Sequence, residues 1–325
     1  MDFRELFEIV SNIIKENDDF LIITHDFPDG DCLGSQVSLF ELLSSLNKKA
    51  TMICNSDIPY QYKFLPHVNN IKKNLNGNIC VNNDFICIYL DSADEERTTL
   101  DIKYLKGKVK QIINIDHHPG NTEYGDINIV DSNKSATAEI LYELIISNFK
   151  SYLSYNIALG IYTGILTDTG KFQYANTTFN VHRIVSHLLE YGINPAKVFS
   201  CIYENEPFNR FKLLELVIKR IILVKSKKLI YSYLLQKDFE RLKLPFSSHD
   251  GVIEFLRSAS DAKIAALFKQ VAKDDFRVSL RSADESYNVA EIAVKFGGGG
   301  HKMASAYAFR GSLDEVVLKL IKSLN

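Results

Sequence analysis

Four short apolar segments in the first half of the chain each lead into polar residues. They are FLIIT (20–24), ATMIC (50–54), FICIYLD (85–91) and QIINID (111–116). Between them, apolar residues recur at spacings of three and four, as in GSQVSLFELLSSLNK (34–48), which is typical of helices that cover a sheet. Fully apolar strands that alternate with helices predict an α/β fold with a doubly wound, mainly parallel sheet.

The second half of the chain has a different pattern. The amphipathic segment RFKLLELVIKRIILV (210–224) predicts a long helix. Strands are predicted at KLIYSYLL (228–235), AKIAALFKQV (262–271) and FRVSLRS (276–282). Before this region the helical pattern is interrupted at Gly192 and Pro195. We therefore predict a first domain over residues 1–190, a linker over 191–212 and a smaller α/β domain over 213–325.

The net charge of the 325-residue chain is −2, which argues against a protein that coats long nucleic acid. The charge is unevenly distributed. Residues 1–212 hold 19 basic and 27 acidic side chains, whereas residues 213–325 hold 19 basic and 13 acidic ones. This asymmetry is compatible with metal binding in the first half and anion binding in the second, and equally with charge scattered over two solvated surfaces.

The remaining bulk features favour a cytoplasmic protein. No apolar run approaches the length of a membrane span, and MDFRELFEIV resembles the start of an amphipathic helix and not a signal peptide. The five cysteines are odd in number and form no CxxC pair, which favours a reducing compartment. Cys32 lies within an acidic motif, where a small packing residue is a more economical interpretation than a reactive thiol.

The acidic motif HDFPDGD (25–31) follows the first predicted strand. Its Pro-Asp-Gly turn places Asp29 and Asp31 on the same side of the loop as His25. Aspartates are common turn formers, so the motif alone is compatible with a purely structural role. One imidazole beside carboxylates also suits Mn²⁺, Mg²⁺ or another borderline-hard divalent ion.

Further acidic residues and histidines follow other predicted strands. Asp91 ends a strand that should be buried, where a carboxylate is costly unless it is paired or binds a metal. The triplet Asp116-His117-His118 ends the next strand, and Asp168 follows another apolar stretch. The triplet alone could be a solvated loop, but the carboxyl ends of parallel strands gather at one edge. The candidate metal ligands are therefore His25, Asp29, Asp31, Asp91, His117 and Asp168, enough for two ions that clamp a phosphate and activate water.

A glycine-rich segment, KFGGGGHKMASA (295–306), lies in the basic half. Its four glycines, Gly297, Gly298, Gly299 and Gly300, precede His301 and would let backbone amides approach a ligand closely. Arg281 lies on a preceding predicted strand. Glycine runs also form flexible linkers, but here structured patterns lie on both sides, which favours a binding segment.

Taken together, these motifs resemble a known family. HDFPDGD, the aspartate of YLDSAD, DHH and TDTG resemble the four ordered motifs of the DHH phosphoesterases, and GGGGHKMASA resembles the signature of the DHHA1 domain. The resemblance implies a DHH domain followed by a smaller DHHA1 domain, with the active site in the cleft between them. Ala306 is a departure, because family members often have glycine there, and it could narrow the substrate pocket.

The resemblance also implies roles for individual residues. Two Mn²⁺ ions are expected, with Mg²⁺ or Co²⁺ as possible substitutes. One ion would be held by His25, Asp29 and Asp91. The other would be held by Asp31, Asp91, His117 and Asp168, with Asp91 bridging. Asp116 would support the catalytic histidines, His118 would contact the phosphate near the leaving group, and Arg281 with Gly297–His301 would grip the far phosphate or nucleotide.

The family includes stand-alone bacterial nano-RNases, 3′-phosphoadenosine-5′-phosphate (pAp) phosphatases, and phosphodiesterases for linear pApA and cyclic di-AMP. The resemblance thus implies hydrolysis of cyclic di-AMP and pApA to AMP, or alternatively nano-RNase and pAp phosphatase activity. A nucleotide-binding sensor is the non-enzymatic alternative. A family II inorganic pyrophosphatase would lack GGGGH, and a processive exonuclease would be longer. The expected partners are short nucleotides and a second copy of the chain, with neither long nucleic acid nor a membrane.

Overall fold

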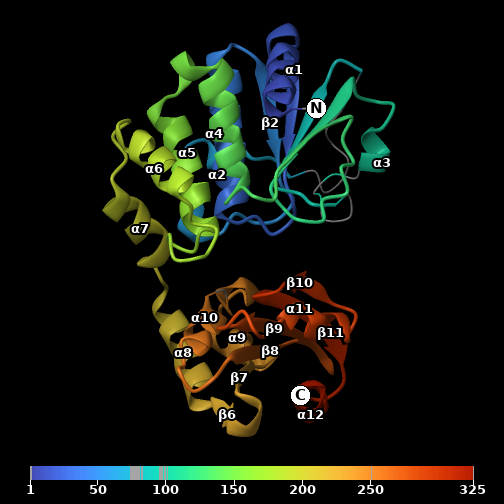
Figure 1. Ribbon diagram of the computed structural model, residues 1–325, viewed down its shortest axis with the longest axis vertical. Helices are drawn as coiled ribbons and strands as arrows, with labels where there is room; N and C mark the ends of the chain where they lie inside the picture. The colour runs from blue at the N-terminus through green and yellow to red at the C-terminus, as the bar shows by residue number, and fades with distance from the viewer. Residues whose placement is uncertain are drawn as a thin grey trace. The chain divides into compact units, whose positions relative to one another are not determined.

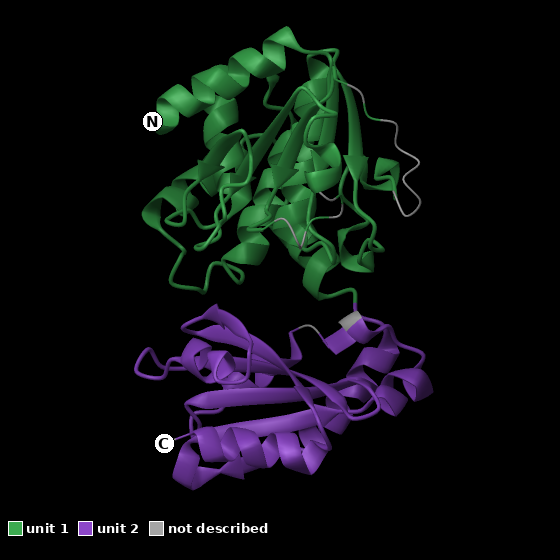
Figure 2. Ribbon diagram, turned by 90° about the vertical axis from the view of Figure 1, so that its right-hand side faces the viewer, with its two compact units in different colours: residues 1–205 green, residues 206–325 purple. Residues whose placement is uncertain are grey.

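The computed structural model describes residues 2–73, 81, 83–94, 98, 100, 102–249 and 251–324 (Figure 1). The chain forms two compact units, residues 1–205 and 206–325 (Figure 2). The division falls within the segment 191–212 that the sequence predicts as a linker. Much of that segment is helical, since it holds α7 (Pro195–Tyr203) and the start of α8 (Phe208–Lys219). The predicted domain limits themselves stay a prediction.

Unit 1 contains a parallel five-stranded sheet with the order β2-β1-β3-β4-β5. Its strands are β1 (Asp19–Ile23), β2 (Lys49–Ile53), β3 (Ile86–Leu90), β4 (Gln111–Asp116) and β5 (Ile127–Val130). The first four are at the positions that the apolar segments predict. Because β2 and β3 lie on opposite sides of β1, the winding direction reverses between β1 and β3, which is where ligand crevices open in such sheets.

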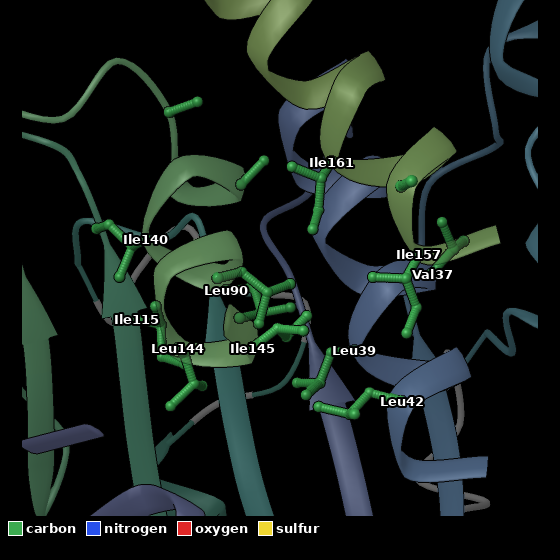
Figure 3. Close-up of a cluster of buried hydrophobic side chains, with 14 of the residues drawn as sticks. Val37, Leu39, Leu42, Leu90, Ile115, Ile140, Leu144, Ile145, Ile157 and Ile161 are labelled. Carbon is green, nitrogen blue, oxygen red and sulfur yellow. The ribbon is translucent and has the colours of Figure 1, made fainter. Parts of the chain in front are cut away.

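Helices cover both faces of this sheet. They are α1 (Phe3–Glu16), α2 (Gly30–Ser45), α3 (Ile102–Leu105), α4 (Thr137–Asn148), α5 (Tyr155–Asp168) and α6 (Phe179–Leu189). Figure 3 shows side chains of α2, α4 and α5, among them Leu39, Leu144 and Ile161, together with Leu90 of β3 and Ile115 of β4. On the opposite face, strand residues such as Leu21, Cys87 and Tyr89 pack with Ile102 and Leu105 of α3. Burial on both faces explains why the strands are apolar throughout.

Helices α2 and α5 pack so closely that glycine is required where they cross. A Cβ atom on Gly34 would lie 2.3 Å from the carbonyl oxygen of Gly160. A Cβ atom on Gly164 would lie 2.6 Å both from the Cβ of Ala138 and from Oδ1 of Asp31. A Cβ atom on Gly30, the first residue of α2, would clash with Thr167, near the end of α5. The beginning of α2 and the end of α5 are therefore held side by side.

Unit 2 contains a mixed six-stranded sheet with the order β10-β11-β9-β8-β7-β6, in which only β7 and β8 pair in parallel. The strands are β6 (Ile222–Val224), β7 (Leu229–Leu234), β8 (Ile264–Ala272), β9 (Asp275–Ser282), β10 (Gly299–His301) and β11 (Ala304–Arg310). Besides α8, the helices are α9 (Gln236–Leu242), α10 (Val252–Arg257), α11 (Val289–Val294) and α12 (Leu313–Ser323). Two buried clusters lie in this unit, one containing Phe268 and Val289 and the other containing Leu213 and Phe239.

One predicted element of unit 2 is wrong in its extent. The helix predicted over 210–224 ends at Lys219, and Ile222–Val224 form strand β6, which pairs antiparallel with β7. The guanidinium of Arg220 follows the helix and donates two hydrogen bonds to Asp238. As strand β6, residues 222–224 pair their backbone with β7. A helix that continued through these residues would not make this pairing.

Short 3₁₀ segments complete the description: η1 (Tyr60–Tyr62), η2 (Val68–Asn70), η4 (Lys150–Tyr152), η5 (Lys225–Lys227) and η6 (Phe246–His249). Within the described ranges, no helix combines the length and apolar character that crossing a membrane requires. Cys32, Cys87 and Cys201 are free thiols, Cys54 is buried, and Cys80 lies outside the described residues.

Replacing Gly34 by alanine should destabilise unit 1, because the new methyl group would overlap the Gly160 carbonyl oxygen. We expect the free energy of unfolding to fall by about 2 kcal/mol, typical of overpacking. Urea denaturation followed by circular dichroism measures this loss. Ser44→Ala, at an exposed position of the same helix, is the matched control and should change stability by less than about 0.5 kcal/mol. Equal stability of the two variants would contradict the close crossing of α2 and α5.

Candidate active site

The predicted metal ligands converge at the carboxyl edge of the unit 1 sheet. His25 follows β1, Asp91 follows β3, and His117 follows the last residue of β4. Asp29 is the N-cap of α2, where its side chain accepts a hydrogen bond from the backbone amide of Cys32 at 3.0 Å. Asp31 lies in the first turn of α2, and Asp168 is the last residue of α5.

Three groups of side chains at this edge have possible ligand atoms within 4.8 Å of one another. They are His25, Asp29 and Asp91; Asp31, His117 and Asp168; and Asp91, His117 and His118. All six residues that the sequence predicts as ligands belong to these groups, and Asp91 belongs to two of them. The structure therefore brings the predicted residues together, while their individual roles as ligands stay a prediction.

Asp91 lies at the centre of the cluster. Its carboxyl group is 2% exposed, with Oδ2 at 3.4 Å from Nε2 of His25 and Oδ1 at 3.7 Å from Nε2 of His117. Thr137 also donates its hydroxyl to Oδ1 at 3.1 Å. Burial alone would raise the pKa of Asp91, but the imidazoles of His25, His117 and His118 hold it below its usual range. Each oxygen thus faces a different histidine, which is the arrangement that a bridging carboxylate requires.

Asp91 also has an unusual backbone conformation. Its φ angle is 58°, in the left-handed region that few residues other than glycine and asparagine or aspartate adopt. Its amide still donates to the carbonyl oxygen of Ile115 at 3.1 Å. The chain therefore stays tied to β4 while the turn at Asp91 directs the side chain along the sheet edge. Such strain is concentrated at functional sites.

Asp31 is completely buried and is bound by the N-terminus of α4. The backbone amides of Thr137 and Ala138 donate to its two oxygens at 2.6 and 2.9 Å. Helix N-termini bind anions because their first amides lack partners within the helix. Even so, burial together with the charges of Asp91 and Asp168 raises the pKa of Asp31 well above its usual value. A nearby cation would favour the charged carboxylate.

Two histidines direct their Nε2 atoms into the cluster. The Nδ1–H of His25 donates to the carbonyl oxygen of Asp26 at 2.8 Å, and Nδ1 of His117 lies 3.4 Å from the carbonyl oxygen of Lys134. A carbonyl partner at Nδ1 leaves the Nε2 lone pair for a metal, as is usual for metal-binding histidines. Nε2 of His117 is buried and, among the described residues, has no hydrogen-bond partner of good geometry, although Asp168 Oδ2 is 3.1 Å away.

The residues at this edge fit divalent cations. Burial lowers the pKa of His117, but Asp168, Asp91 and Asp31 raise it to about 11, so the cluster without an ion retains protons. Carboxylates and imidazoles are the donors that Mn²⁺ and similar borderline-hard ions prefer. A cation would satisfy the buried Nε2 of His117 and would offset the mutual repulsion of the carboxylates.

Asp116 and His118 form a separate pair beside the cluster. Asp116 is fully buried; its Oδ1 accepts from Nδ1–H of His118 at 2.8 Å, and its Oδ2 accepts from Nδ2 of Asn121 at 2.6 Å. Burial lowers the pKa of His118, but Asp116 and Asp91 raise it above its usual value. The imidazole side chain is 36% exposed. Asp116 thus fixes the orientation of an accessible imidazole whose Nε2 points away from the carboxylate.

Three residues of the site are missed by the sequence analysis. Thr137 and Asn121 bind the carboxylates of Asp31, Asp91 and Asp116, as described above. Phe27 lies between His25 and Asp29 with 82% of its surface exposed. The signals available were the polar residues at the start of the amphipathic segment 135–149, for Thr137, and the asparagine of DHHPGN, for Asn121. Phe27 had no signal beyond its place inside HDFPDGD.

The predicted substrate residues lie in unit 2. Arg281 is on β9, where its Nε donates to Oε1 of Glu254 at 2.9 Å. The glycine segment is only partly a loop, because Gly299–His301 form β10 and pair with β11. A Cβ atom on Gly298 would lie 2.2 Å from the carbonyl oxygen of Ala306, whereas a Cβ atom on Gly299 would meet nothing within 4 Å. The role of these residues, and the predicted cleft between the domains, stay predictions.

Comparison with known proteins identifies the family. A family model described as "DHH family, N-terminal domain" matches residues 19–165, and one described as "DHHA1 domain" matches residues 226–325. A curated relative from Streptococcus mutans, named probable bifunctional oligoribonuclease and PAP phosphatase NrnA, is 30% identical over 322 residues, 98% of each chain. This chain belongs to the DHH family. The family resemblance predicted from the motifs is confirmed.

Other comparisons agree with this DHH-family assignment. A Thermus thermophilus relative, named bifunctional oligoribonuclease and PAP phosphatase NrnA, is 28% identical and covers 99% of this chain and 94% of the relative. The solved structure of an exopolyphosphatase-related protein from Bacteroides fragilis is 24% identical, with a TM-score of 0.89 over 98% of this chain and 95% of that one. The predicted fold class is thereby confirmed, as is the broad class of metal-dependent phosphoesterase.

Replacing Asp91 by asparagine should remove metal binding. Asparagine keeps the shape and tolerates the left-handed backbone, so the change tests the charge alone. We expect metal affinity and turnover to fall at least about 100-fold, comparable to the loss of an essential electrostatic group. Elemental analysis after gel filtration and a phosphodiesterase assay measure the two effects. Asp19→Asn, at the start of β1, is the control; unchanged metal content in Asp91→Asn would contradict the bridging role.

Replacing Asp116 by asparagine should leave the metal content intact but slow the reaction. The amide cannot hold the His118 imidazole with the same charge and tautomer, so we expect kcat to fall about 10- to 100-fold. The pH dependence of kcat should also shift, because the Asp116 carboxylate that raises the pKa of His118 is removed. A change confined to KM, or loss of metal together with a fall in kcat, would show that Asp116 does not act by orienting His118.

Proposed function

We propose that this protein hydrolyses very short oligoribonucleotides to mononucleotides and pAp to AMP and inorganic phosphate, with two divalent ions at the cluster around Asp91 and with Mn²⁺ as the preferred metal. The observation that carries this proposal is the geometry of Asp91, whose two carboxylate oxygens face different histidines within a group of carboxylates. The names of the Streptococcus and Thermus relatives support the choice of substrate.

In this proposal the chain holds each ion through a different set of side chains. His25, Asp29 and Asp91 would bind one ion, and Asp31, Asp91, His117 and Asp168 the other. Two bound divalent ions supply a nucleophilic water at neutral pH and neutralise charge on the phosphoryl oxygens. The Thr137 and Ala138 amides keep Asp31 in place, and the α2–α5 crossing keeps Asp31 beside Asp168.

His118 is suited to contact the scissile phosphate. Its Nδ1–H is engaged by Asp116, its side chain is accessible to solvent, and Nδ1 lies 3.6 Å from Oδ1 of Asp91. A protonated imidazole there donates from Nε2 to a phosphoryl oxygen or to the departing oxygen. Burial lowers the pKa of His118, but Asp116 and Asp91 raise it above its usual value, which favours that protonated donor form. Asp116 acts through His118 and is a positioning residue.

The basic second half would bind the far end of a short substrate. We propose that Arg281, His301 and the glycines 297–300 contact the distal phosphate or nucleotide. Arg281 is already oriented by Glu254, so its guanidinium lies in a fixed position on β9. A ligand of two or three nucleotides needs only a few basic contacts, in keeping with the net charge of −2. The predicted homodimer and cytoplasmic location accompany this proposal and stay predictions.

Cyclic di-AMP and linear pApA present a phosphodiester to the same groups. Linear pApA belongs to the class of short nucleotides that the relatives' names describe, so we propose that it is hydrolysed to AMP. Cyclic di-AMP would require a pocket that accepts two adenines folded back on each other. We therefore propose linear substrates before the cyclic one, whereas the family resemblance implied cyclic di-AMP and pApA together, with nano-RNase and pAp phosphatase activity as the alternative.

A panel of substrates tests the proposal. Protein incubated with Mn²⁺ should release AMP from pApA and pAp and should cleave RNA of three nucleotides faster than RNA of ten. Ion-exchange chromatography of the products measures each rate, and Asp91→Asn is the inactive control. Cyclic di-AMP cleaved as fast as pApA would instead make this protein a cyclic dinucleotide phosphodiesterase. No hydrolysis of any nucleotide in the panel with Mn²⁺, Mg²⁺ or Co²⁺ would overturn the proposed function.

A further inference from the structure

The aromatic ring of Phe27 lies exposed in the loop that supplies two of the candidate metal ligands. Phe27 is two residues after His25 and two residues before Asp29, and it is 82% exposed. Burial of a phenylalanine ring stabilises the folded state. A phenylalanine with an exposed ring does not make this contribution, whereas a polar residue at the same position would lose nothing by being exposed. The neighbouring Pro28 is buried. The loop thus packs inward at Pro28 and presents the ring outward.

The backbone of Phe27 is held in a conformation that bulky residues rarely adopt. Its φ angle is 59°, in the left-handed region, and this is a genuine outlier for an aromatic residue. Its amide donates to the hydroxyl of Ser56 at 3.0 Å, and the preceding carbonyl of Asp26 accepts from Nδ1–H of His25 at 2.8 Å. Both bonds engage the peptide unit between Asp26 and Phe27, so they hold the backbone on the N-terminal side of the Phe27 Cα and with it the direction in which the Cβ leaves the loop.

Two other aromatic residues near the motifs, Phe172 and Phe296, are engaged in packing. Phe172 contacts the rings of Tyr162 and His182, with centroids at 6.4 and 5.7 Å. Phe296 stacks on Tyr307 with centroids 4.6 Å apart. Phe27 differs from both, because most of its surface is open to solvent beside the candidate metal cluster.

We propose that the Phe27 ring stacks on a nucleobase of the substrate whose phosphate is bound at the Asp91 cluster. This inference rests on the proposed function and adds a base-binding residue to it. A base stacks on an aromatic ring through its π face, which every base has, so the contact requires a base without selecting its identity. The strained backbone then has a function: it keeps the ring out of the core and next to the ligands His25 and Asp29.

A simpler explanation is that the left-handed backbone serves only to orient the Asp26 carbonyl towards His25. Two variants separate the explanations. Phe27→Asn removes the ring but tolerates the left-handed conformation, so it preserves the loop. Phe27→Trp keeps an aromatic face. If only the backbone matters, Phe27→Asn should behave like the wild type; if the ring binds a base, Phe27→Asn should lose affinity and Phe27→Trp should retain it.

The experiment measures KM and kcat for pApA and for two analogues of pApA, each of which lacks one of the two bases. Phe27→Asn should raise KM for pApA about 5- to 150-fold, the range for loss of one stacked base, with Mn²⁺ content unchanged and kcat within about threefold. For one of the two abasic substrates, wild type and Phe27→Asn should have equal KM values. Phe27→Trp should restore the KM for pApA. Replacing the adenines of pApA by uracil should change the ratio of the KM of Phe27→Asn to the KM of the wild type only slightly.

Three results would overturn the inference: equal KM for pApA in wild type and Phe27→Asn, equal loss on all substrates with or without bases, or loss of Mn²⁺ in Phe27→Asn. A ring that instead contacts another part of the protein would alter the melting temperature or oligomeric state, not the base-dependent KM, and that result also counts against it. Failure of the proposed function is distinguishable, because then the wild-type protein itself would cleave none of the dinucleotides.

Discussion

The concentration of negative charge in a buried position is the constraint on which the rest of unit 1 depends. Asp31 and Asp91 are almost fully shielded from water. Asp29 offers a ligand atom within 4.8 Å of one on His25, and Asp168 offers one within 4.8 Å of one on His117. Such a group is unfavourable without hydrogen-bond donors and positive charge. The chain supplies amides at the start of α4, the hydroxyl of Thr137 and two imidazoles. The remaining deficit of positive charge is one that a bound cation would offset.

The fold brings these groups together through two independent devices. The parallel sheet aligns the ends of β1, β3 and β4, which places His25, Asp91 and His117 along one edge. The glycine-mediated crossing of α2 and α5 brings Asp31 and Asp168 to the same place. The first device relies on backbone pairing and the second on close helix packing, so neither set of ligands would be complete without the other.

The sheet and its polar edge could be predicted because their signals are local. An apolar run followed by an acidic residue reports both a buried strand and its end, and parallel topology determines that such ends meet. Strand β5 was not predicted because INIV is short and its asparagine interrupts the apolar run. The extent of α8 was misjudged because the segment 222–224 is apolar in either structure, and only its partner β7 decides that it is a strand.

The missed site residues depend on tertiary contacts. Thr137 and Asp31 are far apart in sequence, and nothing in either segment reports that the start of α4 faces the start of α2. The exposure and left-handed backbone of Phe27 depend likewise on Ser56, which lies after the next strand. The motifs identified the charged groups correctly as neighbours, but the neutral residues that hold them could be found only from the structure.

The candidate ligands span the chain from His25 to Asp168, whereas unit 2 has its own buried clusters. Two ions bound as proposed would therefore cross-link four separate segments of one unit, around residues 25–31, 91, 117 and 168, and would leave the other unit without such a link. Ligands that bind only the folded state stabilise it by an amount that rises with the logarithm of their concentration above Kd. Metal depletion would thus lower the stability of unit 1, the unit that holds all the candidate ligands.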